Sequence, residues 1–292
     1  MQPLRRRLLS VIVVYGRNLD GVLAWPFLSE CLMANSDDDG ANVDGYVLES
    51  VLIYDNSKEP LARPTGYLRG CSYIHDPGNG GTAAAYSRAC SMAQEAGIDW
   101  LLLLDHDTLL PVGFLEAASL ALNHANSRVG ALVPWVYHGA CVVSPAKVSQ
   151  IGTIVPLQYQ NQQPLVSDLT AISSGALLYV PMLVKKLPFP NGLWLDYVDH
   201  WIFSQIHACG WQIMVFDTSL QHDLSVFAIE SLSLARLTSI LNGEAAFLRT
   251  LSSRARFVYP FRIALRVFRY LLVKPTLAIH TIKWIINRIM NR

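Results

Sequence analysis

The sequence contains few cysteines and no long uninterrupted apolar run. Its 5 cysteines are scattered and none shows CxxC spacing, which argues against a structural zinc site and favours a reducing compartment. No stretch reaches the ~18 apolar residues that a membrane-spanning helix needs. Internal repeats and low-complexity tracts are also absent. What remains is a globular chain of 292 residues, 52% hydrophobic, which can bury one large core or two smaller ones.

Acidic side chains are missing from the last part of the chain. The formal net charge is +1, yet no Asp or Glu follows Glu244. The basic residues beyond it are Arg249, Arg254, Arg256, Arg262, Arg266, Arg269, Lys274, Lys283, Arg288 and Arg292. This asymmetry predicts a globular body with a cationic tail that binds an anionic surface.

The cationic tail has helical periodicity. Residues 251–270 and 271–289 mix aliphatic and aromatic side chains with Arg and Lys, and we expect breaks at Pro260 and Pro275. A basic amphipathic helix is typical of proteins that lie on an anionic membrane surface. The alternative is a helical cap packed on the body, or a partner interface. We favour membrane association and do not interpret the tail as binding nucleic acid, because no stacking platform accompanies it.

The rest of the chain alternates between strand and helix patterns. A basic triplet precedes the first apolar run, as in a signal peptide, but the run is β-branched and lacks a cleavage site. The pattern predicts strands at residues 11–15, 47–54, 73–76 and 100–104, and helices at 19–33 and 83–96. This β-α-β-β-α-β order predicts an α/β fold, with a mostly parallel, helix-covered sheet of the nucleotide-binding kind.

The fourth predicted strand ends in two carboxylates. Residues 100–104 are apolar, and Asp105 and Asp107 follow, separated by His106. In an extended chain both carboxylates point to one face, where they repel each other unless a cation lies between them. The alternative is a solvated turn. Because the preceding strand is so apolar, we favour a site for a hard divalent cation.

Two other strand ends carry ligand-type residues. Asp55 can accept from a ribose hydroxyl or a base N–H, or can form an Asx-turn. The Asn79-Gly80-Gly81-Thr82 loop allows backbone to approach a ligand and presents helix N-terminal amides to an anion, although Thr82 can instead cap the helix. Parallel strands bring these ends to one edge of the sheet, which favours a shared site.

Together these motifs resemble the family-2 inverting glycosyltransferases of the GT-A fold, and most closely the bacterial rhamnosyltransferase-like members that build surface polysaccharides. The resemblance covers residues 8–240 and includes the motifs Val11-Ile12-Val13-Val14-Tyr15, Tyr54-Asp55-Asn56-Ser57, Asn79-Gly80-Gly81, Asp105-His106-Asp107, Ser173-Ser174-Gly175, Leu195-Asp196-Tyr197-Val198-Asp199-His200-Trp201 and Leu220-Gln221-His222. It implies a glycosyltransferase domain at residues 1–240, followed by a basic helical region at 241–292.

The resemblance implies a role for each motif. Asp107 would hold Mg²⁺ or Mn²⁺, with Asp105 and His222 completing the site. The donor would be dTDP-rhamnose or a UDP-sugar. The residues implied in donor binding are Tyr15, Asp55, Asn79, Gly81 and Asp105.

The resemblance also implies an acceptor side. Asp199 would be the catalytic base, with Asp196 as a second candidate that could instead be a helix N-cap. Ser174, Gly175 and Trp201 are expected to line the acceptor. The acceptor would be lipid-linked or a polysaccharide, at the cytoplasmic face of the plasma membrane, and the chain could form a homo-oligomer.

Two other functions fit parts of the sequence. The run ending in Asp105-His106-Asp107-Thr108 also resembles the DxDxT motif of haloacid-dehalogenase-like phosphatases, with Asp105 as the nucleophile. That motif normally ends the first core strand, whereas here three predicted strands and two predicted helices precede it. A non-catalytic sugar-nucleotide-binding module is the third alternative.

Overall fold

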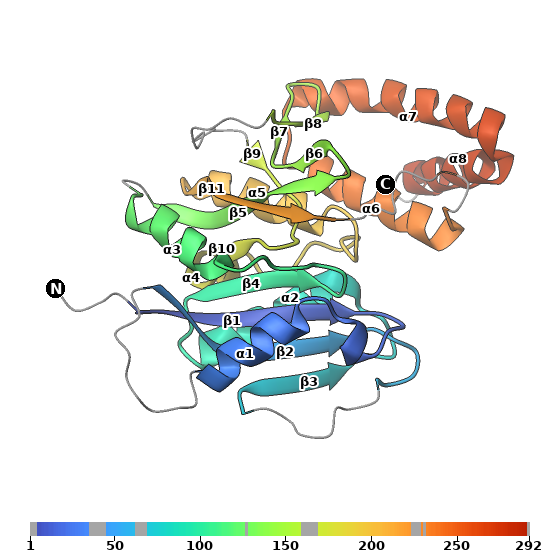
Figure 1. Cartoon of the computed structure of the whole chain (residues 1–292). Coiled ribbons are helices and arrows are strands. Elements are labelled where there is room, and N and C mark those ends of the chain that lie inside the picture. Colours follow the sequence, from blue (N-terminus) through green and yellow to red (C-terminus); the bar gives the residue numbers. More distant parts are fainter. Residues whose placement is uncertain are drawn as a thin grey trace.

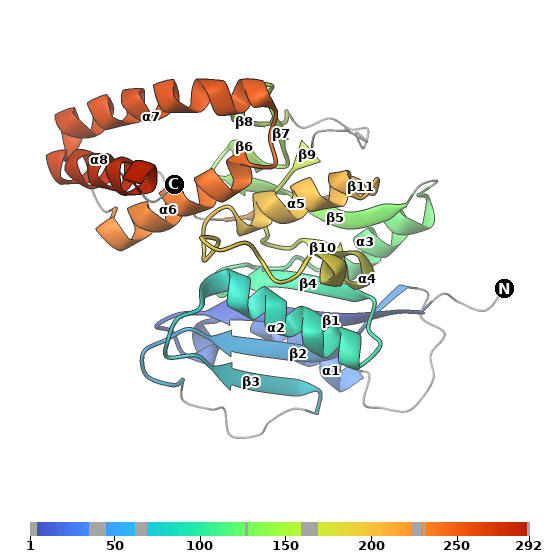
Figure 2. The same cartoon turned by 180° about the vertical axis from the view of Figure 1, so that it is seen from behind.

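The computed structural model describes residues 5–34, 45–61, 69–125, 128–158, 169–222, 229 and 232–290. In these residues the chain forms an α/β structure with a central, mostly parallel sheet covered by helices, the GT-A fold, and a helical C-terminal region (Figures 1 and 2). No helix in the described part of the chain is long and apolar enough to cross a membrane.

The central sheet carries the predicted strands. Its order is β11-β5-β10-β4-β1-β2-β3, with β6 paired to β5. All neighbours along this order are parallel except β10, which is antiparallel to both β4 and β5. The strands are β1 (Arg5–Val14), β2 (Gly45–Asp55), β3 (Cys71–His75), β4 (Trp100–Asp105), β5 (Val129–His138), β6 (Cys141–Ser144), β10 (Leu177–Tyr179) and β11 (Gln212–Gln221). A second sheet has the order β8 (Ile154–Pro156), β7 (Ala146–Val148), β9 (Leu169–Thr170).

Helices cover both faces of this sheet. One core contains side chains of α2 (Gly81–Glu95), α4 (Val180–Leu183) and α5 (Val198–Ala208). The other core contains side chains of α1 (Trp25–Ala34) and α3 (Phe114–Asn123). The short 3-10 helices η1 (Leu19–Gly21) and η2 (Val184–Lys186) flank α1 and α4. Strand β4 is covered by helices on both faces, and its residues 100–104 are all buried. This explains why they form an unbroken apolar run.

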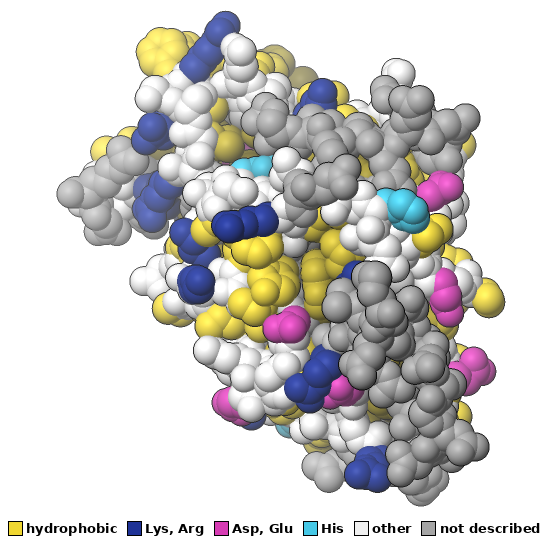
Figure 3. Space-filling model, turned by 90° about the vertical axis from the view of Figure 1, so that its left-hand side faces the viewer, with side chains coloured by type: hydrophobic (Ala, Val, Ile, Leu, Met, Phe, Trp, Pro, Cys, Tyr) yellow, Lys and Arg dark blue, Asp and Glu magenta, His cyan; other side chains and the backbone are white. Residues whose placement is uncertain are grey.

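The strand register aligns the ends of the strands that carry the predicted site. Val14 pairs with Asp55, Asp55 pairs with His75, and Asp105 pairs with Val13. The carboxyl ends of β1–β4 therefore form one edge, at the right of Figure 1. The opposite edge, at the amino ends, is the face in Figure 3, where hydrophobic, basic and acidic side chains are interspersed.

Two helix boundaries differ from prediction for local reasons. The predicted helix 19–33 begins only at Trp25, because Pro26 is suited to the first turn, where its missing N–H leaves no bond unmade. The helix for which Asp196 was a candidate N-cap begins only at Val198, because Tyr197 has a left-handed φ of 65°. Asp196 therefore lies outside the helix, and its interpretation as an N-cap is wrong.

The C-terminal helices α6 (Leu234–Leu248), α7 (Ser253–Val273) and α8 (Pro275–Met290) share a small core of their own. The predicted break at Pro260 is wrong, because α7 continues through it. Pro260 is exposed, so water can solvate the carbonyl group that loses its partner there. The predicted break at Pro275 is confirmed, because α7 ends at Val273 and α8 begins at Pro275. The predicted division at residue 240 falls within α6 and stays a prediction.

A buried ion pair joins α6 to α7. Glu244 is 4% exposed and accepts hydrogen bonds from both terminal nitrogens of Arg266, at 2.7 and 2.9 Å. Tyr259 donates to the same carboxylate at 3.1 Å. Burial raises the pKa of Tyr259, and the nearby Glu244 charge raises it further. Glu244, the last acidic residue of the chain, is therefore paired inside the protein and does not balance the cations on the surface.

Candidate active site

Asp105, Asp107 and His222 meet at the carboxyl edge of the sheet. Asp105 ends β4, Asp107 follows two residues later, and His222 follows β11, whose chain direction is the same. One ligand atom from each residue lies within 4.8 Å of the other two, and all three residues are partly buried. The structure therefore brings together the residues expected to hold a cation.

The donor set fits a divalent metal ion. The Asp107 Oδ1 and His222 Nδ1 atoms are 3.8 Å apart, too far for a hydrogen bond, and both are buried without a hydrogen-bond partner in the described residues. Such orphaned buried polar atoms are costly unless an ion or water satisfies them. Two carboxylates suit Mg²⁺ or Mn²⁺, and the imidazole favours Mn²⁺ over Mg²⁺ because Mg²⁺ prefers oxygen ligands.

The carboxylate of Asp105 is held in place by a hydroxyl group. Ser174 Oγ donates to Asp105 Oδ2 at 2.7 Å. Burial raises the pKa of Asp105, while this hydrogen bond and the nearby His222 oppose the rise. Ser174 was expected on the acceptor side, but the structure gives it a different contact: it orients a carboxylate of the predicted metal site.

The other two predicted acceptor residues lie in the core. At Gly175 a Cβ would lie 2.5 Å from Leu220 and 3.1 Å from Pro134, so the glycine is required by packing. Trp201 is 6% exposed and packs edge-on against Phe189, with ring centroids 5.3 Å apart. Both residues are thus held by core packing, and a role for either toward the acceptor stays a prediction.

Asp55 organises the loop that follows β2. Its carboxylate accepts from Ser57 N at 2.9 Å, Leu61 N at 3.0 Å and Tyr73 Oη at 2.6 Å. Burial acts to raise the pKa of Asp55, but these hydrogen bonds outweigh it and lower the pKa. The contact with Ser57 is that of the Asx-turn alternative, so a role toward the donor stays a prediction.

The glycine loop before α2 packs against protein rather than opening toward a ligand. At Gly81, which has a φ of 71°, a Cβ would lie 2.6 Å from Trp194 Cδ1 and closer still to the Trp194 carbonyl oxygen. Gly81 N donates to Asn56 Oδ1, and Ala83 N donates to the Trp194 carbonyl oxygen. These two amides are therefore bonded to protein, and a role for Gly81 toward the donor stays a prediction. The Thr82 hydroxyl donates to the carbonyl groups of residues 194 and 195 and does not cap the helix.

Asn79 and Asp76 shape this loop. Asn79 has a φ of 51°, and its carbonyl oxygen accepts from Trp194 Nε1 at 2.5 Å. Asp76, which the sequence interpretation missed, accepts from the Gly78 and Gly80 amides and from Tyr54 Oη. The Gly80 amide is the main cause of the lowered pKa of Asp76, with Tyr54 contributing. An Asp four residues before a glycine at a strand end is the signal that could have identified it.

Tyr15 lies where the resemblance placed it. It is 60% exposed and directly follows β1 at the carboxyl edge. The next amide, Gly16 N, donates to Ser57 Oγ at 2.7 Å, which ties this turn to the loop after β2. The phenol ring is therefore available to a planar ligand at the edge, and its role toward the donor stays a prediction.

The two candidate bases differ in their partners. Asp199, in the first turn of α5, accepts from the His200 amide at 2.7 Å, and its second oxygen carries no hydrogen bond to any described residue. Asp196 Oδ1 lies 2.9 Å from an Arg236 nitrogen, and its side chain is 8% exposed. Burial raises the pKa of Asp196, and Arg236 opposes the rise. Asp196 Oδ2 also lacks a hydrogen-bond partner among the described residues but is buried, so the candidates differ mainly in burial and in the contact of Asp196 with Arg236.

Tyr86 connects the two sides of the site. Its side chain is fully buried in α2, and burial raises its pKa well above the ordinary value. The carboxylates of Asp105 and Asp199 are both close enough to raise it further. The metal-site carboxylate and the candidate base therefore lie in one region of the molecule.

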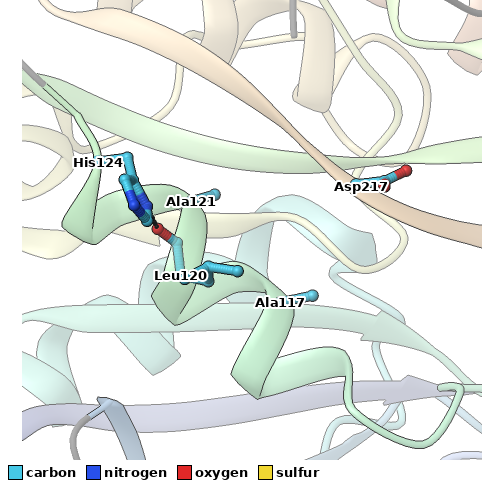
Figure 4. A pocket seen from close by; sticks show the side chains of 5 residues that line it. All are labelled: Ala117, Leu120, Ala121, His124 and Asp217. Atoms are coloured by element: carbon cyan, nitrogen blue, oxygen red, sulfur yellow. Dashed lines mark hydrogen bonds between the residues drawn. The ribbon is translucent and has the colours of Figure 1, made fainter. Parts of the chain in front are cut away.

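A separate hollow of about 370 Å³ lies between α3 and β11 (Figure 4). It is lined by Ala117, Leu120, Ala121 and His124 on the helix and by Asp217 on the strand. His124 Nδ1 contacts the Leu120 carbonyl oxygen at 2.7 Å, the bond drawn in Figure 4. None of the predicted site residues lines this hollow, so it is distinct from the carboxylate cluster.

Comparison with known proteins assigns the chain to a family. Residues 10–182 match the sequence profile described as glycosyl transferase family 2. No curated protein sequence matches the chain significantly.

Solved structures share the fold at low sequence identity. TarS residues 1–349 of S. aureus in complex with UDP-GlcNAc align with a TM-score of 0.50 and 13% identity, covering 87% of this chain and 73% of TarS 1–349. A mycobacterial protein aligns with a TM-score of 0.48 and 14% identity, covering 84% of this chain and 74% of that protein. Against the longer S. aureus TarS structure the TM-score is 0.47 at 13% identity, covering 87% of this chain but only 44% of TarS.

Proposed function

Because the chain belongs to glycosyl transferase family 2, we propose that it is a metal-dependent inverting glycosyltransferase. It would move a sugar from a nucleoside diphosphate donor to a lipid-linked or polysaccharide acceptor. The observation that carries the proposal is the group Asp105, Asp107 and His222 at the strand ends, where Asp107 Oδ1 and His222 Nδ1 are buried without a partner among the described residues. Membership of this family also disfavours the phosphatase alternative.

The residues divide the chemistry between donor and acceptor. When bound, Mg²⁺ or Mn²⁺ would neutralise the charge that develops on the leaving diphosphate. Ser174 holds Asp105 in the orientation that the site needs. Tyr15 and residues 56–61 after Asp55 border the same edge, where the nucleotide would lie.

Inversion requires a base opposite the leaving group. We propose Asp199, because its free oxygen can accept the proton of the acceptor hydroxyl as that oxygen bonds to the anomeric carbon. Asp196 is the weaker candidate, because its contact with Arg236 favours a carboxylate that holds the loop rather than one that takes up a proton.

The resemblance to rhamnosyltransferase-like members favours dTDP-rhamnose as donor. UDP-sugars are the alternative, including the UDP-GlcNAc found with TarS. We place the reaction at the inner face of the plasma membrane, because the cationic C-terminal region suits an anionic surface.

One experiment tests metal, base and donor together. Purified full-length protein is incubated with dTDP-rhamnose or UDP-sugars, with and without Mn²⁺, and nucleoside diphosphate release is measured. Asp107→Asn should weaken Mn²⁺-dependent nucleotide binding. Asp199→Asn should leave that binding unchanged while turnover falls by about 10²–10⁴-fold.

Asp99→Asn, a change at a carboxylate outside the site, is the control and should behave as wild type. Donor turnover that needs no metal and survives Asp107→Asn would refute the proposal. Donor binding without turnover on any acceptor would instead support the non-catalytic module.

A further inference from the structure

The helix α7 has two apolar faces, and only one of them is covered. Tyr259, Ile263 and Tyr270 are buried in the C-terminal core. A second row, spaced four, four, three and four residues apart, is 60–73% exposed: Phe257, Phe261, Leu265, Phe268 and Leu272. A surface helix normally turns charged and polar side chains outward, so the exposed row requires a cause.

The next helix repeats the arrangement. In α8, Leu277, Ala278 and Thr281 are buried, while Ile279, Ile282, Ile286 and Ile289 are 41–68% exposed. We call these two exposed rows, on α7 and α8, the outer face. The hairpin of α7 and α8 extends beyond the sheet on the side of its carboxyl ends (Figures 1 and 2).

Cations are the only charged residues in this segment. Arg256 and Arg269 on α7 and Lys283 on α8 are exposed. No acidic residue follows Glu244, and Glu244 itself is buried with Arg266. In a symmetric pairing of two copies through this face, such cations would approach one another with no acid in the segment to neutralise them. A second copy is therefore a poor occupant.

We infer that the outer face docks on an anionic lipid bilayer, with the apolar rows in the acyl boundary and Arg269 and Lys283, which flank these rows, at the headgroups. An anionic surface supplies both an apolar layer and the counter-charge that the segment lacks. The helices lie on the membrane rather than crossing it, in accord with the absence of a spanning helix among the described residues. The inference does not depend on the sugar donor or on the transfer reaction.

Vesicle sedimentation of the full-length protein tests the inference. The probes are phosphatidylcholine vesicles with and without phosphatidylglycerol. Wild type should bind the anionic vesicles, and added salt should weaken binding. The double variant Phe261→Ser/Phe268→Ser should lose about tenfold or more in vesicle affinity, whereas Leu120→Ser should lose none. Leu120 is a matched control, since it is 61% exposed on α3, outside this face.

A charge variant separates the contributions and guards against misfolding. Arg269→Gln/Lys283→Gln should bind anionic vesicles more weakly and with less salt dependence, while both double variants keep the wild-type melting temperature because the altered side chains are exposed. Equal vesicle binding by wild type and the phenylalanine variant would overturn the inference. A wild-type dimer that ignores vesicles and dissociates in that variant would also overturn it, in favour of a second copy.

Discussion

Replacing Gly81 with alanine separates two explanations of the glycine loop. If the glycine is there to let a ligand approach, Gly81→Ala should impair donor binding and leave the folded state intact. If it is there to fit Trp194, the variant should destabilise the protein. The structure favours the second explanation, because the new Cβ would overlap Trp194 Cδ1, Nε1 and carbonyl oxygen.

The size of the effect follows from two costs. A non-glycine residue at a φ of 71° costs about 1–2 kcal/mol. Overpacking against a fixed neighbour adds about 1–3 kcal/mol. Gly210→Ala isolates the first cost, because Gly210 has a φ of 72° and a Cβ there would meet nothing within 4 Å. The difference between the two variants is therefore the cost of the Trp194 contact.

Thermal unfolding measures that difference. At roughly 2–4 °C per kcal/mol, Gly81→Ala should melt about 2–12 °C below Gly210→Ala. Nucleotide affinity, measured by calorimetry well below the melting transition, should change little in either variant. Equal melting temperatures for the two variants, with donor affinity lost only in Gly81→Ala, would refute the packing explanation.

Three further substitutions test the charged groups. Glu244→Gln should lower the free energy of unfolding by about 2–4 kcal/mol in urea titration, somewhat less than for a fully buried pair because Arg266 keeps some exposure; an unchanged midpoint would contradict this. Asp105→Asn should raise the melting temperature of the metal-free protein at neutral pH, since burial raises the pKa of Asp105 and its ionised form destabilises the fold. That gain should vanish as the pH falls and the wild-type carboxyl group becomes protonated. Asp55→Asn should have the opposite effect on stability, because hydrogen bonds outweigh burial and lower the pKa of Asp55. The variant should be less stable than wild type at neutral pH, and the difference should shrink as the pH falls through that pKa. Parallel pH profiles for the two variants would show that the environments of these carboxylates are not opposite.

The sequence predicted those parts of the fold that local pattern determines. The apolar run of β4 and its terminal carboxylates identified the buried central strand and the edge of the site. Parallel pairing then brought Asp55 and Asp105 to the same edge, as expected. His222 was located only by the family resemblance, because nothing in its own neighbourhood distinguishes a ligand from a structural histidine.

What the sequence did not show depends on contacts between distant segments. The space that a Cβ at Gly81 would need is occupied by Trp194, which is far along the chain. A glycine motif does not reveal which residue packs against it. The contact of Ser174 with Asp105 was likewise not predictable, because it forms only when β10 pairs with β4. The burial of Trp201 was not predicted either, because an aromatic residue next to a motif looks the same in sequence whether it faces a cleft or the core.

The segment that carries the candidate base is held from two sides, which links acceptor chemistry to the C-terminal helices. On one side Trp194 packs on Gly81 and bonds to Asn79 at the start of α2. On the other, Gly243 of α6 approaches the Asp196 carbonyl oxygen so closely that no Cβ fits between them. Tyr197, whose backbone is left-handed, lies between these two contacts and directly before α5. Both contacts therefore help to maintain its strained backbone. Because α6 also packs against α7 and α8, the segment that carries Asp199 is joined to the C-terminal helices by a continuous run of packed side chains.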